Sequence, residues 1–214
     1  MKVVSLNAGQ ARTVNYKGKN LVTGIFKSPV SSPIYLGETD VKNDNVVDRK
    51  FHGGIDKAVY AYSVEHYPFW KKIYPNLEWN YGMFGENLTI QGLSESLVHI
   101  GNKYKIGQAV IEVCQPRQPC FKLGLRFETQ NVLKQFVNSP YSGVYFRVST
   151  PGLVHKEDQL KLMYSEPDTP TIAEVYLLMY KKQSGADALI EKTINCTFLP
   201  MDIRETIRER QARL

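Results

Sequence analysis

Residues 144–150, with the sequence VYFRVST, carry the clearest strand pattern in the chain. Apolar side chains at every second position alternate with Tyr145 and Arg147, which is the two-residue period of a strand with one buried face. A charge in the middle of such a strand must be paired or must point into a polar cavity. The pattern therefore predicts a strand and makes Arg147 a candidate binding residue.

On both sides of this strand the chain consists of short segments rich in β-branched or aromatic residues, bounded by Gly, Pro, Asn and Asp. We predict further strands at residues 1–7, 21–26, 58–63, 87–90, 109–115 and 159–164. Two helices are predicted between them, at 64–74, with Pro68 in the first turn, and at 128–137. Many short strands joined by irregular loops are typical of a β-barrel or a sandwich.

The period of the sequence changes near residue 168. Thr169 followed by Pro170 is a favourable helix start, and apolar residues then recur every three or four positions from Ile172 to Met179. Two more segments with a single apolar face follow, the third beginning near Pro200 or Asp202. We therefore predict a mainly β protein with a helical tail, with a barrel domain at 1–166 and a helical domain at 167–214.

Composition and charge restrict the class of protein. The chain has 214 residues, 43% of them hydrophobic, and a net charge of +6. Residues 168–214 are neutral, so the whole basic excess, 20 basic against 14 acidic residues, lies in residues 1–167. This excess predicts an anionic partner such as a phosphate-bearing cofactor. The N-terminus has no signal-peptide core, which favours a cytoplasmic protein, and no apolar run is long enough for a membrane span.

The three cysteines are expected to be unpaired, because their number is odd and their spacing wide. Cys120 lies in the segment 115–123, QPRQPCFKL, where two prolines stiffen the backbone and two basic residues flank the sulfur. Neighbouring cations favour the thiolate, the form that binds metals or acts as a nucleophile. A lone cysteine is more often a small buried hydrophobe, so this pattern alone leaves both interpretations open. Zinc is disfavoured, because no Cys or His pair has ligand spacing.

Two loops rich in glycine could also bind a ligand. In the segment 48–58, DRKFHGGIDKA, His52 and Lys57 flank Gly53 and Gly54, whose backbone can approach an anion closely. In the segment 82–88, GMFGENL, Glu86 or Asn87 could fix backbone or ligand amides. Taken singly, each loop is more often a structural turn.

Together these motifs resemble a known family. FHGG-x-DKAV from residue 51, GENL from residue 85 and QPR-x-PC-x-KL from residue 115 occur in this order in MOSC proteins. Those are the C-terminal domains of molybdenum-cofactor sulfurases and their stand-alone relatives. The likeness is greatest to the stand-alone YiiM-type members, associated with resistance to 6-N-hydroxylaminopurine, and it covers essentially the whole chain. It implies a MOSC-type β-barrel with interspersed helices, followed by a small C-terminal three-helix bundle.

The resemblance implies that the molybdenum cofactor (molybdopterin) binds through Cys120 as the metal ligand. A single soft thiolate suits this role, because the dithiolene of the cofactor supplies the other sulfur ligands. Contacts to the pterin or its phosphate are then assigned to Arg49, His52, Gly53, Lys57, Asn87, Arg117 and Arg147.

The activity implied is the reduction of N-hydroxylated compounds to amines, contributing to detoxification, with Cys120 and His52 as catalytic residues. His52 is the expected proton donor, because histidine titrates near neutral pH. The chain has no flavin, nicotinamide or iron–sulfur fingerprint, so a separate protein should supply the electrons.

Two other functions remain open. A sulfur carrier would hold a persulfide on Cys120, and a basic barrel could bind nucleotide or nucleic acid, although the scattered lysines disfavour nucleic acid. The tyrosine-rich stretch 60–81 could be an oligomer interface or part of the core.

Overall fold

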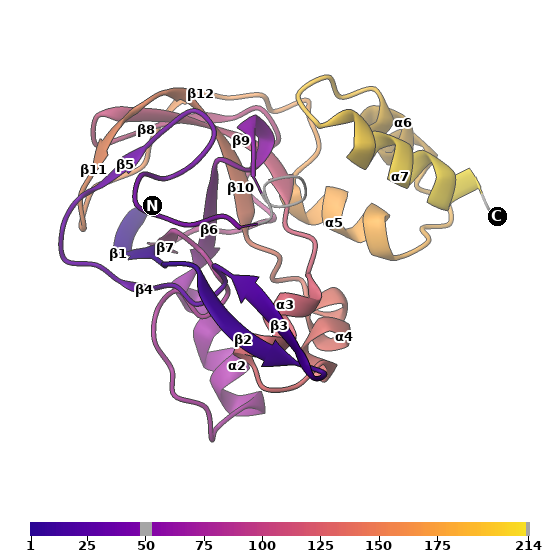
Figure 1. The fold of residues 1–214 in the computed structure, drawn as a ribbon. Coiled ribbons are helices and arrows are strands. Elements are labelled where there is room, and N and C mark those ends of the chain that lie inside the picture. Colours follow the sequence, from indigo (N-terminus) through magenta and orange to yellow (C-terminus); the bar gives the residue numbers. More distant parts are fainter. Residues whose placement is uncertain (48–52, 213–214) are drawn as a thin grey trace.

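The computed structural model describes residues 1–47 and 53–212, and its centre is an eight-stranded mixed sheet (Figure 1). The strand order is β12-β8-β9-β10-β6-β7-β1-β4. Neighbouring strands are antiparallel except β6 and β7, which run parallel. The strands are β1 (Lys2–Ala8), β4 (Ser28–Pro29), β6 (Val59–Ser63), β7 (Leu88–Gln91), β8 (Lys103–Ile106), β9 (Ala109–Pro116), β10 (Val144–Thr150) and β12 (Lys161–Tyr164).

Contacts between β1 and the segment before β12 curl the sheet toward a barrel. The backbone N–H of Val3 donates to Asp158 at 2.9 Å, and that of Leu160 donates to Met1 at 3.0 Å. An isolated bridge also joins Lys2 to Gln159. The predicted fold class, mainly β with a barrel-like sheet and helices, is confirmed.

Strand β10 occupies the predicted residues and has the predicted alternation. Val144, Phe146 and Val148 are buried, whereas Tyr145 and Arg147 are partly exposed on the opposite face. The strand is central because it pairs with β9 on one side and with β6 on the other.

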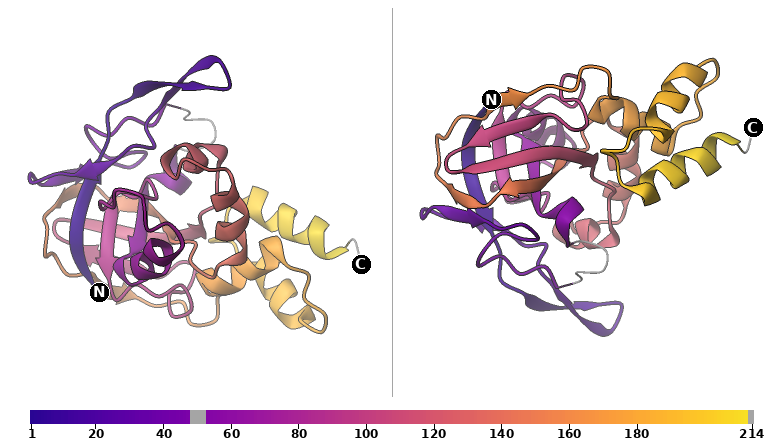
Figure 2. Two further views of the ribbon diagram at one scale, coloured as in Figure 1. Left: turned by 90° about the horizontal axis from the view of Figure 1, so that it is seen from below. Right: turned by 90° about the horizontal axis from the view of Figure 1, so that it is seen from above.

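Two smaller sheets flank the main one. Strand β5 (Ile34–Leu36) pairs with β11 (Gly152–Val154), and β2 (Arg12–Tyr16) pairs with β3 (Lys19–Thr23). The β2–β3 hairpin projects away from the body of the molecule in both views of Figure 2. Its turn uses Lys17 (φ 51°) and Gly18 (φ 77°), the two left-handed positions of a tight hairpin turn.

Short helices cover one end of the sheet. They are η1 (Ile55–Lys57), η2 (Val64–His66), α2 (Tyr67–Ile73), α3 (Phe121–Arg126) and α4 (Asn131–Asn138). The predicted helix at 64–74 is confirmed as η2 plus α2, with Pro68 in the first turn. The helix predicted from residue 128 begins only at Asn131, and α3 was not predicted.

An aromatic cluster packs α2, α3 and α4 against the sheet. Trp70 lies 5.6 Å from Phe84 and 5.9 Å from Phe136 between ring centroids, and all three rings are fully buried. Tyr60, Tyr62 and Tyr67 belong to the same cluster. Much of the tyrosine-rich stretch is therefore core, and its use as an oligomer interface stays a prediction.

The tail consists of α5 (Ile172–Tyr180), α6 (Asp187–Ile194) and α7 (Met201–Ala212), which confirms the predicted three helices. Helix α5 begins two residues after Pro170, because Thr171 and Glu174 form a capping box. At the other end of α5, the Gln211 side chain donates to the carbonyls of Leu178 (2.9 Å) and Lys181 (3.2 Å).

The tail and the barrel share one apolar cluster. Ile111 and Val113 of β9 belong to it together with Ile172 and Val175 of α5 and Ile203 of α7. Full burial of each such side chain contributes about 1.5–3 kcal/mol, so the tail is anchored on the sheet. The domain boundary at residues 166 and 167 stays a prediction.

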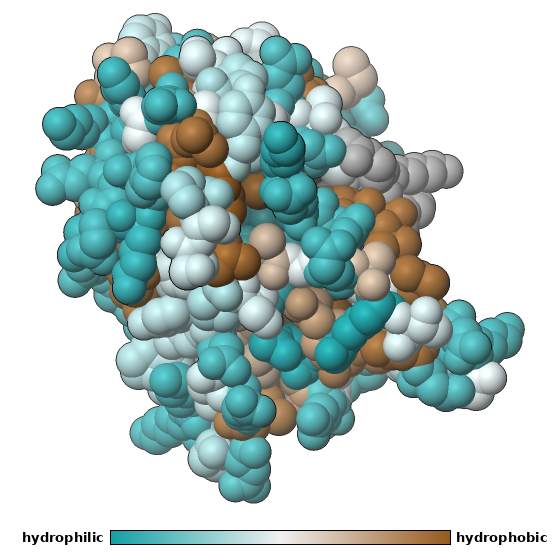
Figure 3. Space-filling view, turned by 60° about the vertical axis from the view of Figure 1, so that its left-hand side comes forward, coloured by the Kyte–Doolittle hydropathy of each residue, from teal (hydrophilic) through white to brown (hydrophobic). Residues whose placement is uncertain are grey.

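On the face shown in Figure 3, apolar side chains reach the surface in several separate places among hydrophilic ones. Within the described residues, none of the helices has the length and apolar character needed to span a bilayer.

Candidate functional site

A cleft opens at the base of the β2–β3 hairpin. It encloses about 640 Å³ of space, including its open mouth. Its walls come from the end of β3 and the following loop, the segment 45–47, the residues around η1 and β6, and the segment 117–122. Four of the predicted site residues line it: Lys57, Asn87, Arg117 and Cys120.

Cys120 is the thiol that faces this cleft. It immediately precedes α3, has an extended backbone (φ −112°, ψ 152°) and is partly exposed. Cys114 and Cys196 are buried, and burial raises the pKa of both thiols, as expected for packing residues. Of the three cysteines, Cys120 is therefore the one available to a ligand.

The charged side chains that line the cleft are all basic, and one of them, Lys27, is paired with Asp44. Lys27, Lys57, Arg117 and Lys122 line it, and its described lining contains no carboxylate. Such an excess of cations in a concave site favours an anionic ligand. Lys122 was noticed in the sequence only as a neighbour of Cys120, and Lys27 was missed.

Arg117 is held rigidly at the inner wall. Its side chain is buried, donates to the backbone carbonyl of Phe84, and lies 5.0 Å from the ring centroid of Tyr60. Burial lowers the pKa of Arg117, but the neighbouring Tyr60 and Tyr145 hydroxyls and the Cys120 thiol outweigh this, so the pKa is raised and the cation persists.

The turn that carries Phe84 is fixed by a buried carboxylate. Glu86 accepts hydrogen bonds from the backbone N–H groups of Gly82 (2.9 Å) and Phe84 (3.0 Å), and from the hydroxyls of Tyr67 and Thr89. With four donors around it, this carboxylate shapes the wall on which Arg117 is anchored.

Asn87 supports the wall from inside. Its amide nitrogen donates to Asp44 at 2.9 Å, and its amide oxygen accepts from the backbone N–H of Tyr60 at 3.3 Å. Asp44 also pairs with Lys27 and accepts from Gly9. Burial lowers the pKa of Lys27, and the neighbouring Asp44 partly opposes this. Because the nitrogen and the oxygen of the Asn87 amide both form hydrogen bonds within the protein, Asn87 holds the wall of the cleft in place.

Comparisons with known proteins identify the family. The MOSC domain profile matches residues 48–161. The uncharacterized protein YflK of Bacillus subtilis is 42% identical over 161 residues, which are 75% of this chain and 72% of YflK. The chain belongs to the MOSC-domain family. The crystal structure of YiiM from Geobacillus stearothermophilus superimposes with a TM-score of 0.80 at 31% identity and covers 98% of both chains.

A longer relative carries a functional name. A protein of Gibberella moniliformis named Reductase is 32% identical over 187 residues, or 86% of this chain. The match covers only 32% of that protein, so most of its length has no counterpart here. MOSC domains occur at the C-terminus of molybdenum-cofactor sulfurases, and the family associates this chain with that cofactor.

Arg147 is not among the residues that line the cleft, and it connects β10 with η1, β9 and the tail instead. Its side chain donates to Asp56 (2.6 Å), to Glu112 (3.0 Å) and to the backbone carbonyl of Phe198 (2.8 Å). The charge in the middle of β10 is thus explained by ion pairs and by a contact with the tail. The structure does not bring Arg147 together with Lys57, Arg117 and Cys120.

The other predicted residues lie in or beside the glycine loop. Gly53 is not among the residues that line the cleft. The next residue, Gly54, has a φ of 94°, a backbone conformation that favours glycine. Arg49 and His52 fall outside the described residues, so their assignments stay predictions. Asp56, which follows the two glycines, is held by a hydrogen bond from the side-chain amide of Gln115 to its backbone carbonyl, at 3.2 Å.

Two tyrosines of the cleft were missed. Tyr60 and Tyr145 lie on adjacent strands with ring centroids 4.9 Å apart, and both line the cleft. Burial raises the pKa of both hydroxyls, so they remain protonated near neutral pH. The alternation of residues 144–148 already places Tyr145 on the face opposite the core, and that was the available signal.

Within residues 1–47 and 53–212, no three His, Cys, Asp or Glu side chains form a group able to hold a metal ion. A metal held by fewer described side chains would take its further ligands from other residues or from a cofactor that carries its own sulfur ligands.

Proposed function

We propose that this chain binds the molybdenum cofactor through Cys120 and reduces N-hydroxylated compounds, such as 6-N-hydroxylaminopurine, to amines. The proposal depends chiefly on one observation. A partly exposed thiol opens on a cleft lined by four cations and by no described carboxylate. Membership of the MOSC family and the fungal relative named Reductase support the same activity class.

The chemistry of the cleft fits the cofactor. Thiolate is a soft ligand suited to molybdenum, whereas the absence of carboxylates from the described lining makes the cleft unsuited to Mg²⁺ or Ca²⁺. Lys57, Arg117 and Lys122 would hold the phosphate of the pterin, and Tyr60 and Tyr145 provide aromatic surface. Arg49 and His52 are proposed to add contacts from the adjacent segment.

When bound, the cofactor would supply two-electron redox chemistry at its metal. The protein would bind and orient it: Cys120 as a ligand, Arg117 as a cation fixed by the Phe84 carbonyl, and the Lys27–Asp44–Asn87 network as a rigid wall. His52 is proposed to deliver a proton to the leaving oxygen of the substrate.

The overall reaction consumes two electrons and two protons. R–NHOH gives R–NH₂ and water: the N–O bond breaks, one N–H bond forms, and the oxygen leaves as water. The sequence has no flavin, nicotinamide or iron–sulfur fingerprint, and a separate electron-transfer protein is therefore proposed as the source of the electrons.

The metal content of three proteins tests the proposal. Wild type, Cys120→Ser and the control Cys196→Ser would be purified from a host able to make the cofactor and analysed for molybdenum. We expect near-stoichiometric metal in wild type and in the control, and none in Cys120→Ser. Equal metal in all three would eliminate Cys120 as the ligand. Loaded protein would then be assayed for reduction of 6-N-hydroxylaminopurine with reduced methyl viologen as the donor.

A sulfur carrier is the second candidate, because Cys120 is the cysteine that a persulfide donor could reach. In that case intact-mass analysis of metal-free protein would show one additional sulfur on Cys120. The same analysis of Cys120→Ser would show none. Molybdenum without a persulfide favours the reductase, and a persulfide without molybdenum favours the carrier.

A further inference from the structure

The β2–β3 hairpin is a basic arm, a name used here for residues 12–23. It contains Arg12, Lys17 and Lys19, and no acidic residue occurs between positions 9 and 26. The arm thus contributes three positive charges to a chain whose net charge is +6. Lys17 and Lys19 at its tip are exposed.

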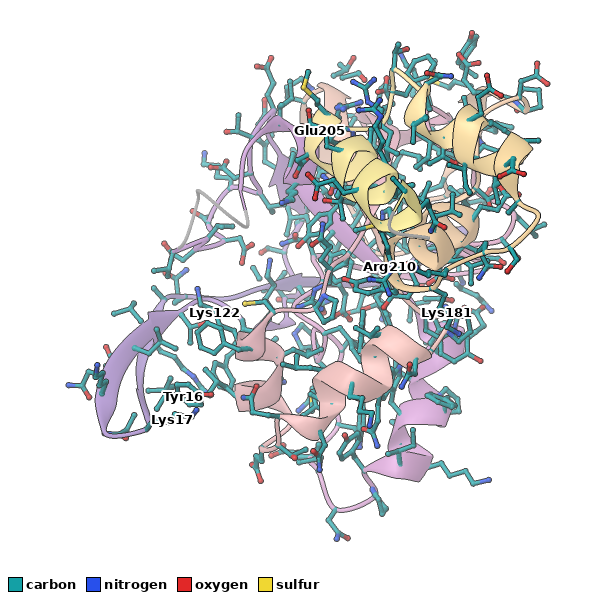
Figure 4. The ribbon with its side chains drawn as sticks, turned by 90° about the vertical axis from the view of Figure 1, so that its right-hand side faces the viewer. Tyr16, Lys17, Lys122, Lys181, Glu205 and Arg210 are labelled. Carbon is teal, nitrogen blue, oxygen red and sulfur yellow. The ribbon has the colours of Figure 1, made fainter. Side chains whose placement is uncertain are left out.

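The arm lies beside a second group of cations. The ring of Tyr16 packs on Phe121 of α3, with centroids 5.5 Å apart. The guanidinium carbons of Arg12 and Arg126 lie 3.2 Å and 5.6 Å from the ring centroid of Phe26. Figure 4 shows Tyr16 and Lys17 on the arm, on the same side of the molecule as Lys122 at the start of α3.

No carboxylate among residues 1–47 and 53–212 forms an ion pair with Arg12, Lys17, Lys19 or Arg126. Burial first, and then the neighbouring Arg12, lower the pKa of Arg126, and the more distant carboxylates of Glu86 and Glu78 partly oppose this. The Nε atom of Arg126 is buried and has no hydrogen-bond partner among the described residues. An acidic partner would add a carboxylate beside these two arginines.

The arm has little structural use of its own. Most of its residues are exposed, and a two-stranded sheet is marginally stable alone. Lys17 occupies a left-handed turn position at which Asn or Gly is usual. Thr23, the last residue of β3, and the following Gly24 line the cleft, so a protein docked on the arm would stand near the mouth of the cleft.

We propose that the basic arm and α3 form the docking surface for a small acidic electron-transfer protein of the flavodoxin or ferredoxin class. This inference rests on the proposed reductase function and names the surface on which the electrons arrive. The reduced flavin or iron–sulfur centre of the partner is oxidised as it supplies the two electrons that break the N–O bond of R–NHOH. Two protons from solvent complete the amine and the water.

An acidic protein fits the arm better than nucleic acid does. Proteins that bind single strands stack successive bases on a series of exposed aromatic rings, whereas the arm has a single aromatic residue, Tyr16, which is half-buried against Phe121. Exposed lysines around a redox site mainly accelerate association with a partner of opposite charge.

The test compares two double charge reversals. Lys17→Glu/Lys19→Glu changes the tip of the arm, and Lys105→Glu/Lys161→Glu makes the same charge change on the paired strands β8 and β12. All four lysines are exposed, so both variants should fold, which thermal unfolding would confirm. Binding of purified flavodoxin and of a [2Fe–2S] ferredoxin would be measured at low and at physiological salt.

We expect the arm variant to bind at least one carrier on the order of tenfold more weakly than wild type at low salt, and the control variant to bind it normally. Turnover driven by that carrier should fall in parallel, while turnover driven by reduced methyl viologen should not change.

Three outcomes separate the hypotheses. If neither carrier binds wild type, or if the arm variant binds as well as wild type, the docking proposal is overturned. Arm-dependent binding of double-stranded DNA without carrier binding would overturn it in favour of nucleic acid. If carrier binding depends on the arm but loaded wild type is inactive with methyl viologen, the reductase function fails and the docking surface stands.

Discussion

Replacing Arg147 with methionine tests whether this residue joins structural elements or contacts the cofactor. Methionine keeps the apolar stem but removes the hydrogen bonds to Asp56, Glu112 and the Phe198 carbonyl. The structure assigns all three bonds to stability, because Arg147 does not line the cleft. We therefore expect Arg147→Met to destabilise the protein while molybdenum loading at low temperature remains.

The size of the effect follows from exposure. The Asp56 side chain is 37% exposed, so its ion pair contributes only about 0.5–1 kcal/mol. The Glu112 side chain is only 11% exposed, but in the variant it would still form its ion pair with Lys103 at 3.2 Å. Losing the bond between Arg147 and Glu112 therefore costs about 1–1.5 kcal/mol. The bond to Phe198 adds about 1 kcal/mol. The total is about 3 kcal/mol, which lowers the Tm of a chain of this size by roughly 6–12 °C.

Thermal unfolding followed by circular dichroism would measure the shift. Arg208→Met on α7 is the matched control, because Arg208 is exposed, and we expect it to change stability by less than about 0.5 kcal/mol. A variant of Arg147 that melts like the control but loses its molybdenum would refute the reasoning. Arg147 would then be a cofactor contact, as the sequence alone suggested.

Three further changes test the capping box, the buried carboxylate and the cleft tyrosine. Thr171→Ala should cost about 1–2 kcal/mol in urea unfolding, and Thr171→Ser much less; equal losses would contradict the capping role. Glu86→Gln turns an NH₂ group toward backbone and hydroxyl donors and should cost about 1–3 kcal/mol; a neutral result would mean that these bonds contribute little. Burial raises the pKa of Tyr145, and Arg117 partly offsets this, so the folded form resists ionisation. Its contribution to stability is complete below about pH 10 and is lost, by at most about 1.4 kcal/mol per pH unit, as the pH rises through the folded pKa. Urea unfolding at several alkaline pH values should show a shallower loss for Tyr145→Phe than for wild type, and identical slopes would disprove the effect.

Local patterns were sufficient for much of the fold. Strand β10 was predicted because its alternation lies within seven consecutive residues, and the three tail helices because each repeats apolar residues on one face. Strands β5 and β11 have three residues each, too few to show a period, and they exist because they pair with each other, as in the pair of Tyr35 and Leu153, which are 118 positions apart. Such strands are fixed by tertiary pairing, which no local pattern reveals.

The same distinction applies to the cleft. Lys57, Arg117 and Cys120 lie in loops marked by glycine or proline, and the sequence showed them for that reason. Lys27 contacts a carboxylate 17 residues away, and neither partner lies in such a motif. For Arg147, the sequence predicted that the charge needs a partner but could not choose between an ion pair and a polar cavity.

The contacts of Arg147 also connect the helical tail with a residue beside the cleft. One side chain on β10 reaches both the carbonyl of Phe198, which precedes α7, and the carboxylate of Asp56, which is adjacent to the cleft residue Lys57. Because these bonds share one guanidinium, the position of the tail and the position of the glycine loop are set by the same group. No described residue of the tail lines the cleft, yet through Phe198 and Arg147 the tail is connected to Asp56, the residue next to one of the four cations of the cleft.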